Sequence, residues 1–119
     1  MDASIDHGDI LFERRFQIPP NAWVEDLYEL TFNESLDLFI ETIADILEGN
    51  YSKIPQVNLI QKRGTSIHYR SEINDLKNIN LSWDQQKIER HIRATYMPGF
   101  EPPFTMLDGE KLYFKKEWK

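Results

Sequence analysis

The segment from residue 22 to residue 48 constrains the fold most, because it reads as one long amphipathic helix. Apolar side chains recur there at spacings of three and four residues, and acidic residues fill the positions between them. Pro19-Pro20 stops whatever precedes the helix, and Gly49-Asn50 ends it, since glycine accepts the left-handed position after a helix. Asn21 is the expected N-cap, and Asn33 could divide the segment into two helices. A chain of 119 residues allows one domain with a modest core around this helix.

The segments on either side of the helix are expected to be strands. Residues 9–18 alternate like a strand, with Arg14 breaking the pattern. A short connecting strand is expected after Pro55-Gln56, and residues 64–70 are a further strand candidate. Residues 71–80 are polar and are expected to form a loop.

The C-terminal third predicts a second helix and a hairpin. Ser82 and Gln85 fit a capping box at the start of a helix over residues 83–95. After a proline-rich connector, Asp108-Gly109 lies between two apolar runs and predicts a β-hairpin over residues 104–114. The fold class is therefore α+β: a strand, a long amphipathic helix, short strands, a second helix and a C-terminal hairpin.

Composition and charge narrow the functional classes. Residues 1–50 hold twelve acidic and two basic side chains, whereas residues 51–119 hold eight acidic and twelve basic ones. The acidic half repels phosphate backbones, so nucleic acid is not an expected partner. The chain has no cysteine, no apolar run as long as a membrane span and no spacing of histidines and carboxylates typical of a metal site. We therefore expect a cytoplasmic protein with no metal and no membrane span.

Several short motifs in a fixed order carry a resemblance to a known family. They are Ser4-Ile5-Asp6-His7-Gly8-Asp9-Ile10-Leu11, Pro55-Gln56, the Thr65, Tyr69 and Arg70 pattern, Ile92-Arg93-Ala94 before Pro98-Gly99, and Gly109-Glu110-Lys111. Their order and spacing resemble the C-terminal half of folate-dependent formyltransferases of the methionyl-tRNA formyltransferase superfamily, and the tail looks most like that of sugar N-formyltransferases. The resemblance implies a partial formyltransferase fold. Residues 1–56 would end the catalytic domain, and residues 57–119 would form a small C-terminal subdomain.

The resemblance implies one catalytic residue in this chain, the carboxylate of Asp6. In the family it works with an asparagine and a histidine that lie upstream in a His-x-Ser-x-Leu-Pro segment, which this chain lacks. A carboxylate in this role orients the histidine and stabilises its charged form while an amine attacks the formyl carbon. Without the other half, we expect the chain alone neither to bind N10-formyltetrahydrofolate nor to transfer formyl groups. The alternative is that Asp6 only shapes a turn before Gly8.

Two residues of the opening motif and three later ones complete the candidate site. Gly8 is expected to allow a backbone conformation that other residues avoid, and Asp9 to brace the loop. His68 and Arg70 share one face of the expected strand, where they could reach a sugar or phosphate or simply form a solvated surface. Arg93 could bind a phosphate, or could brace the connector through hydrogen bonds to carbonyl groups.

The motifs alone leave two classes of acceptor for the formyl group, a tRNA and an amino sugar. Methionyl-tRNA formyltransferases append a sizeable basic domain, whereas only residues 57–119 follow Gln56 here and they are mildly basic. This favours the amine of a nucleotide-linked amino sugar. The aromatic ending, Trp118 above all, suits a homodimer interface. The alternatives are part of a methionyl-tRNA formyltransferase, or a non-catalytic dimerisation or interaction module.

Overall fold

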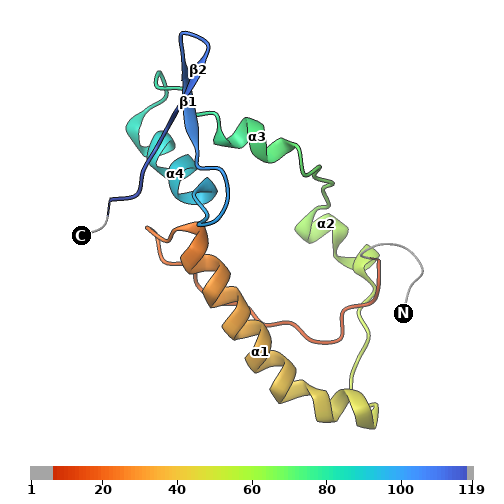
Figure 1. The fold of residues 1–119 in the computed structure, drawn as a ribbon. Helices are drawn as coiled ribbons and strands as arrows, with labels where there is room; N and C mark the ends of the chain where they lie inside the picture. The colour runs from red at the N-terminus through yellow and green to blue at the C-terminus, as the bar shows by residue number, and fades with distance from the viewer. Residues whose placement is uncertain (1–6, 118–119) are drawn as a thin grey trace. The chain divides into compact units, whose positions relative to one another are not determined.

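The computed structural model describes residues 7–117 and contains five helical segments and one hairpin in that range. In chain order they are α1 (Val24–Glu48), a 3-10 helix (Gln56–Leu59), α2 (Ile60–Arg63), α3 (Glu72–Lys77), α4 (Gln85–Thr95), β1 (Phe104–Leu107) and β2 (Glu110–Tyr113) (Figure 1). Contacts divide the chain into two compact units. The first unit holds the residues up to Gln17 and Thr31–Ile67. The second unit holds Ile18–Leu30 and the residues from His68 onward.

Helix α1 begins and ends where the local sequence provides partners for its free backbone groups. The backbone N–H of Trp23 donates to the carboxylate of Asp26 at 2.9 Å, and Glu25 adds a second negative charge to the first turn, which the helix dipole favours. Gly49 adopts a φ of 76° directly after the last turn. The helix continues through Asn33, so the expected division at that residue is wrong.

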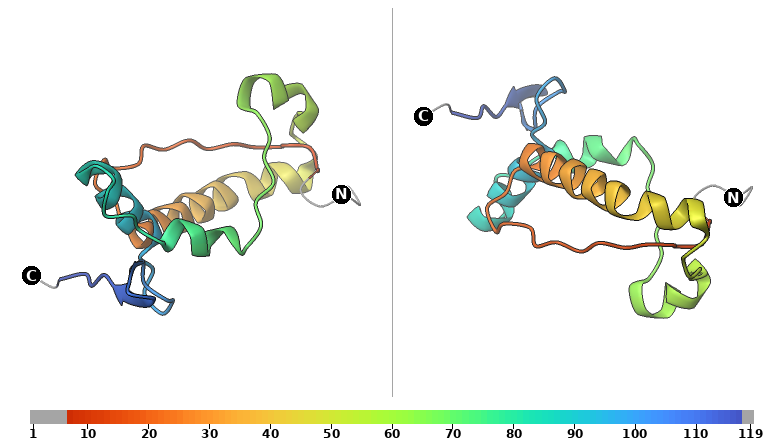
Figure 2. Two further views of the ribbon diagram at one scale, coloured as in Figure 1. Left: turned by 90° about the horizontal axis from the view of Figure 1, so that it is seen from above. Right: turned by 90° about the horizontal axis from the view of Figure 1, so that it is seen from below.

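In the first unit, residues 7–17 run beside α1 (Figure 2). Ile10 and Ile54 exchange two backbone hydrogen bonds, with N···O distances of 2.9 and 3.0 Å. Residues 9–12 line a shallow groove together with Leu38, Thr42 and Ile46 of the helix. Residues 9–12 are therefore held by a backbone bridge at Ile10 and lie beside apolar side chains of α1.

Ion pairs hold the same segment in place. The Arg14 guanidinium contacts the carboxylates of Glu34 and Glu41, two turns apart on α1. These contacts raise the pKa of Arg14, chiefly through the hydrogen bond to Glu41. Glu13 accepts hydrogen bonds from two nitrogens of Arg63 on α2 and from Nε of Arg15. Arg14 interrupts the apolar alternation of residues 9–18 because its side chain pairs with the acidic face of the helix.

The second unit has a small core at the base of the hairpin. Ile79 is 1% exposed, and its backbone N–H donates to the carbonyl of Phe104 at 2.7 Å. Phe104 and Pro103 are buried beside it. Trp23 meets Tyr96 edge to face, with ring centroids 5.8 Å apart. The residue directly before α1 thus contacts the residue directly after α4 within this unit.

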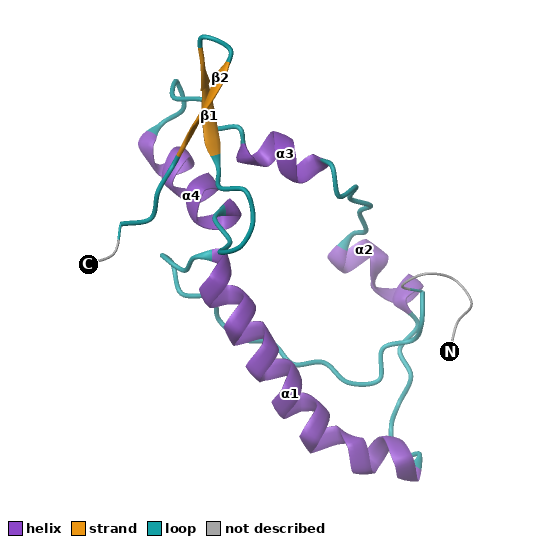
Figure 3. Ribbon diagram, viewed as in Figure 1, coloured by secondary structure: helices purple, strands orange, loops and turns teal. Residues whose placement is uncertain are grey.

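The hairpin was predicted correctly. β1 and β2 pair antiparallel, with Phe104 opposite Tyr113 and Leu107 opposite Glu110, and they form the only sheet among the described residues (Figure 3). Asp108 and Gly109 both adopt positive φ, 49° and 79°. An Asp-Gly pair tolerates this conformation, which matches the twist of a two-residue turn. The coarse fold class, helices with a small antiparallel sheet, is confirmed.

The other expected strands are wrong. Residues 9–18 are extended, but only Ile10 forms a bridge. The segment after Pro55 forms the 3-10 helix and α2 instead of a connecting strand, and residues 64–70 form no strand. A strand needs a neighbouring strand for its backbone groups, and none of the described segments lies beside these residues in a ladder. The alternation of apolar and polar residues in a sequence does not show whether a neighbouring strand is present.

The polar segment 71–80 was expected to be a loop, but it contains α3. The N-caps were also assigned to the wrong polar residues. The cap of α4 is Asp84, whose carboxylate accepts from the backbone N–H of Lys87 at 3.0 Å, so the helix begins after the expected Ser82. Similarly, α1 begins at Val24, too late for Asn21 to be its N-cap.

The ion pairs of the first unit predict a pH response. The hydrogen bonds from Arg63, and then those from Arg15, hold the pKa of the Glu13 carboxyl below its ordinary value. A carboxyl with a lowered folded pKa stabilises the fold above its ordinary pKa, and that contribution is lost as the pH falls through the lowered value. We expect an NMR titration to place the Glu13 midpoint below the ordinary value, and Arg63→Met to move it upward. Lys62→Met, the matched change on α2, should leave the midpoint in place; a midpoint indifferent to Arg63→Met would contradict the assignment.

Candidate functional site

The structure places the expected site residues in two separate regions. Gly8 and Asp9 lie in the first unit, whereas His68, Arg70 and Arg93 lie in the second. Two further predictions, Asp6 as the catalytic carboxylate and Trp118 as an interface residue, fall outside the described residues. Each region is defined by its own contacts.

The opening motif is anchored to the segment that follows α1. The side-chain amide of Gln56 donates from Nε2 to the backbone carbonyl of Gly8 at 2.7 Å. Two residues further on, Ile10 pairs with Ile54 through both of its backbone groups. These three hydrogen bonds fix the path of the chain directly after Asp6. We call the group made by Gly8, Ile10, Ile54 and Gln56 the loop anchor.

The roles expected for Gly8 and Asp9 have different outcomes. Gly8 is not among the glycines with positive φ, and a Cβ built on it would meet no atom within 4 Å. The expectation that Gly8 adopts a backbone conformation closed to other residues is therefore wrong. Asp9 is exposed and lines the groove beside α1. Its role as a brace stays a prediction.

His68 and Arg70 line a pocket of about 1170 Å³ that lies wholly within the second unit. The pocket is formed by residues 68–77, the end of α4 and the connector after it, with Val24 of α1. Arg93 does not line it, although its neighbours Ala94 and Thr95 do. The structure thus brings two of the three expected binding residues together and places the third nearby on α4.

The charges around this pocket are unevenly paired. The Glu72 carboxylate receives a hydrogen bond from the backbone N–H of Tyr69 at 3.1 Å and lies 3.0 Å from His68 Nδ1. The bond from Tyr69 and then that with His68 lower the pKa of Glu72, so this carboxyl stays ionised. Among residues 7–117, no hydrogen bond or ion pair engages the Arg70 guanidinium, which is exposed. The carboxylate of Glu72 is therefore already hydrogen-bonded, whereas the guanidinium of Arg70 makes no such contact with the described residues.

Sequence reasoning did not single out three residues of these two regions. Lys77 lines the pocket although it is only 8% exposed. The pKa of Glu101 is lowered chiefly by the hydrogen bond from Lys111, and the charge of Lys77 adds to this effect. Phe100, in the Pro-Gly connector, also lines the pocket. Gln56 was noticed only as part of a motif. A long-range contact such as that of Gln56 with Gly8, 48 residues away, leaves no local pattern in a sequence.

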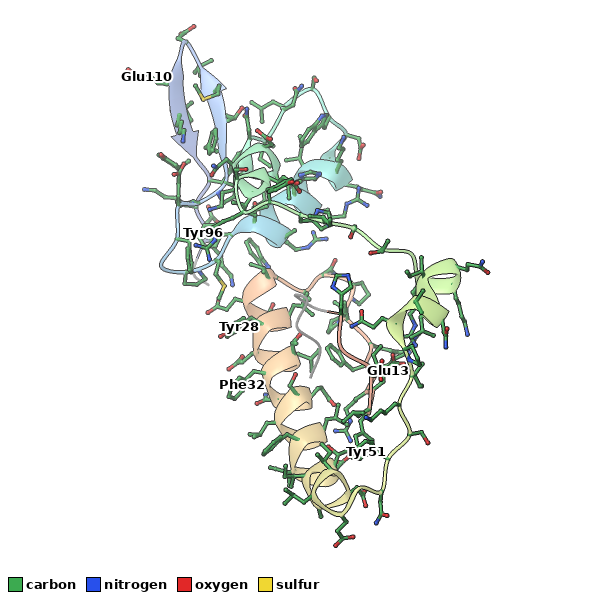
Figure 4. The ribbon with its side chains drawn as sticks, turned by 90° about the vertical axis from the view of Figure 1, so that its right-hand side faces the viewer. Glu13, Tyr28, Phe32, Tyr51, Tyr96 and Glu110 are labelled. Atoms are coloured by element: carbon green, nitrogen blue, oxygen red, sulfur yellow. The ribbon has the colours of Figure 1, made fainter. Side chains whose placement is uncertain are left out.

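Helix α1 carries more apolar surface than its own chain covers. None of its 25 residues is buried. One side packs against residues 9–12, as described above. A second row of side chains, which we call the open face of α1, is exposed: Phe32, Leu36, Ile40 and Leu47. Figure 4 shows Phe32 on the side of the helix away from the segment that carries Glu13.

Two findings concern metals and membranes. In the described part of the chain, no group of three or more histidines and carboxylates is arranged to hold a metal ion. Among the helices of the same residues, none is both long and apolar enough to cross a membrane.

Comparison with curated proteins finds formyltetrahydrofolate enzymes and a sugar-modifying enzyme. The chain is 28% identical over 117 residues to the cytosolic 10-formyltetrahydrofolate dehydrogenase of Xenopus laevis, and 29% identical to the human mitochondrial enzyme of that name. Each match covers 95% of the chain and 12% of the relative. It is 24% identical over 113 residues to GDP-perosamine N-formyltransferase of Brucella melitensis, covering 95% of the chain and 41% of that enzyme. No protein-family model matches the chain.

Solved structures with the same fold are formyltransferases, one of them named as a sugar N-formyltransferase. A 4-N formyltransferase from Francisella tularensis superposes with a TM-score of 0.81 at 21% identity, and a sugar N-formyltransferase from a Shewanella species with a TM-score of 0.78 at 22% identity. Both matches cover 100% of this chain and 48% of the solved one. The chain therefore spans about half the length of these structures, and less of the curated relatives.

The loop anchor generates a prediction about local stability. A neutral hydrogen bond of this kind contributes about 0.5–1.5 kcal/mol. We expect Gln56→Leu to increase amide hydrogen exchange at Ile10 and Ile54 by about two- to tenfold, while the hairpin amides stay unchanged. Gln61→Leu, an exposed glutamine on α2, is the control. Equal exchange at Ile10 in both variants would show that the amide does not hold the loop.

Motifs, fold and relatives agree on one assignment. The motifs predict a formyltransferase, the curated relatives act on or with formyl groups by name, and the solved structures share the fold along the whole chain. The resemblance of this chain to folate-dependent formyltransferases, with sugar N-formyltransferases as its structural neighbours, is confirmed.

Proposed function

We propose that this chain is the part of an N10-formyltetrahydrofolate-dependent N-formyltransferase that follows the donor-binding lobe, and that the enzyme formylates the amine of a nucleotide-linked amino sugar. The chain contributes the Asp6 carboxylate. The asparagine, the histidine and the donor site come from a second lobe, whether on the same polypeptide or on another. The 119 residues alone do not catalyse transfer.

The observation that carries the proposal is the match to an N-formyltransferase of GDP-perosamine, which extends over 113 residues and 95% of the chain. The two solved neighbours point the same way, since both are formyltransferases and one is named for sugars. The acidic first half weighs against tRNA as the acceptor, because tRNA binding depends on neutralising phosphates. Cytoplasmic location and a homodimer stay predictions from the sequence.

Asp6 suits the chemistry because the amine nitrogen becomes positively charged when it attacks the formyl carbon, and it must then lose a proton. A carboxylate beside a histidine holds the ring in one tautomer and stabilises its charged form. Such a pair works only if its geometry is fixed before the substrate arrives. On the present chain, the loop anchor holds the backbone at Gly8 and Ile10, which are the second and fourth residues after Asp6 in the sequence.

The open face of α1 supports the need for a second lobe. Large exposed apolar patches are uncommon on complete domains and mark contact surfaces. The open face runs along consecutive turns of one helix, as a docking surface does. Because the solved neighbours contain about as much chain again, they have the material to cover it.

A non-catalytic module is the second candidate, and the same open face is the observation that favours it. If α1 docks against a copy of itself, the chain dimerises without any donor-binding lobe. Sedimentation equilibrium distinguishes the two candidates. A tight dimer that the donor-binding lobe does not dissociate supports the module, whereas a monomer that binds the lobe supports the enzyme.

A complementation assay tests the catalytic proposal. We expect no turnover from the purified chain. Turnover should appear when it is mixed with the part of the Francisella enzyme that the chain does not match, with N10-formyltetrahydrofolate and a nucleotide-linked amino sugar. In that mixture Asp6→Asn should reduce the rate by about 10²–10⁴, the usual contribution of a group that assists proton transfer. Release of tetrahydrofolate measures the rate.

Asp2→Asn is the matched control, since it removes a carboxylate four residues away without touching the motif. It should keep the full rate. Turnover by the chain alone, or an Asp6→Asn variant as fast as the control, would contradict the proposal.

A further inference from the structure

Residues 11–17 form an extended segment whose backbone is unpaired. Among residues 7–117, none of the N–H and carbonyl groups of this segment takes part in a hydrogen bond. The side chains at positions 12, 14 and 16 are half-buried, whereas those at positions 13, 15 and 17 are exposed, which is the alternation of a strand. The segment therefore has the form of a β-strand that lacks a ladder. We call it the unpaired strand.

The two edges of the unpaired strand differ. Ile10, directly before it, directs both its N–H and its carbonyl to Ile54. Because alternate residues of a strand direct their backbone groups to opposite edges, the even-numbered residues share the edge of Ile10 and the odd-numbered residues 11–17 form the other edge. We call this second edge the odd edge. An edge of this kind is a template for another strand.

The sequence of the unpaired strand is complementary to itself when two copies run antiparallel. With Arg14 at the centre, Glu13 lies opposite Arg15 of the second copy, and Phe12 lies opposite Phe16 of the second copy. The odd-numbered residues then form the hydrogen-bonded pairs, which is the geometry that the odd edge requires. Centring the pairing on Glu13 or on Arg15 also uses the odd edge, but it places like charges directly opposite each other, which destabilises a sheet. The charges therefore select one register.

The exposed face of the strand already carries the charges that this register needs. The side chain of Arg15 is 73% exposed, and its Nε lies 3.0 Å from the carboxylate of Glu13 in the same chain. Glu13 also accepts hydrogen bonds from Arg63, and a carboxylate has room for several donors. Pairing two copies would therefore place the charges of Glu13 and Arg15 in alternation across the two strands.

The face of the strand toward α1 also tolerates the pairing. The two copies of Arg14 would meet there, and like charges in that position repel. Each Arg14 is paired with the carboxylates of Glu34 and Glu41, which offset this repulsion. On both sides of the centre Phe12 meets Phe16, and aromatic pairs across two strands are favourable.

We propose that two copies of this chain associate through the odd edge of the unpaired strand, in the antiparallel register centred on Arg14. The interface has two-fold symmetry, so each contact occurs twice. It differs from the open face of α1 and from the aromatic ending of the chain. The inference goes beyond the proposed function, because the association needs neither a formyl donor nor Asp6.

Sedimentation equilibrium of the full 119-residue chain and its charge variants tests the proposal. We expect the unaltered chain to dimerise. Glu13→Arg and Arg15→Glu should each weaken the dimer by about tenfold or more, because each places like charges opposite each other at both symmetric positions. An equal mixture of the two variants should associate again, since every acidic position then faces a basic one. This recovery also shows that both variants are folded.

Two further variants are controls for the position of the interface. Lys62→Glu on α2 makes the same change of charge as Arg15→Glu at a site away from the strand, and it should leave the dimer unchanged. Leu36→Glu on the open face of α1 should also leave it unchanged, because that side chain takes no part in the pairing.

Each remaining outcome decides against the interface. The proposal is overturned if the chain is monomeric at millimolar concentration, if both strand variants dimerise as well as the Lys62 control, or if the mixture stays monomeric. A dimer that is lost only in Leu36→Glu would place the interface on the open face instead. The readout is the mass of the particle and not turnover, so failure here leaves the catalytic proposal standing, and failure of complementation leaves this interface standing.

Discussion

The apolar surface of α1 is the constraint on which the rest of this structure depends. A helix of 25 residues has two apolar sides, and the chain has one extended segment to place against it. That segment covers one side, where Arg14 adds ion pairs to Glu34 and Glu41. The other side, the open face, remains in contact with solvent. Burial of apolar side chains is the main source of folding free energy. Because no residue of α1 is fully buried, the helix depends for its stability on packing against neighbouring segments.

This constraint explains why the two regions of interest differ in character. The loop anchor in the first unit consists of backbone groups and one side-chain amide, and it holds the backbone at Gly8 and Ile10. The pocket of the second unit is built around α3, α4 and the connector, next to the buried core formed by Ile79 and Phe104. The loop anchor therefore positions a segment of the chain, whereas the second unit contains a pocket.

The sequence was informative where structure is local. The Asp-Gly turn and the spacing of α1 depend on residues a few positions apart, and both predictions were confirmed. The strands at 9–18 and 64–70 were wrong, because a strand is defined by a neighbour that alternation cannot reveal. α3 was missed because Glu72, Asn74 and Asp75 gave its segment the composition of a loop.

The candidate site followed the same division. His68 and Arg70 were expected to share a strand face; they share a pocket instead, since residues from a helix and a distant connector fold against their segment. Gln56 could not have been assigned from the sequence, because its partner Gly8 lies 48 residues away in the chain. Lys77 could not have been assigned either, because its burial becomes apparent only in the folded structure. The role of Asp6 came from motif order alone, which is information about relatives and not about local physical chemistry.

The make-up of the loop anchor has a consequence for how a titrating group behaves beside it. Every group in it is an uncharged amide or carbonyl, so its strength changes little with acidity or salt. Because none of these groups ionises, the hydrogen bonds at Gly8 and Ile10 persist whether a carboxylate near them in the sequence is charged or neutral. A support built from lysine or arginine would instead have pulled on that charge and lowered its affinity for protons.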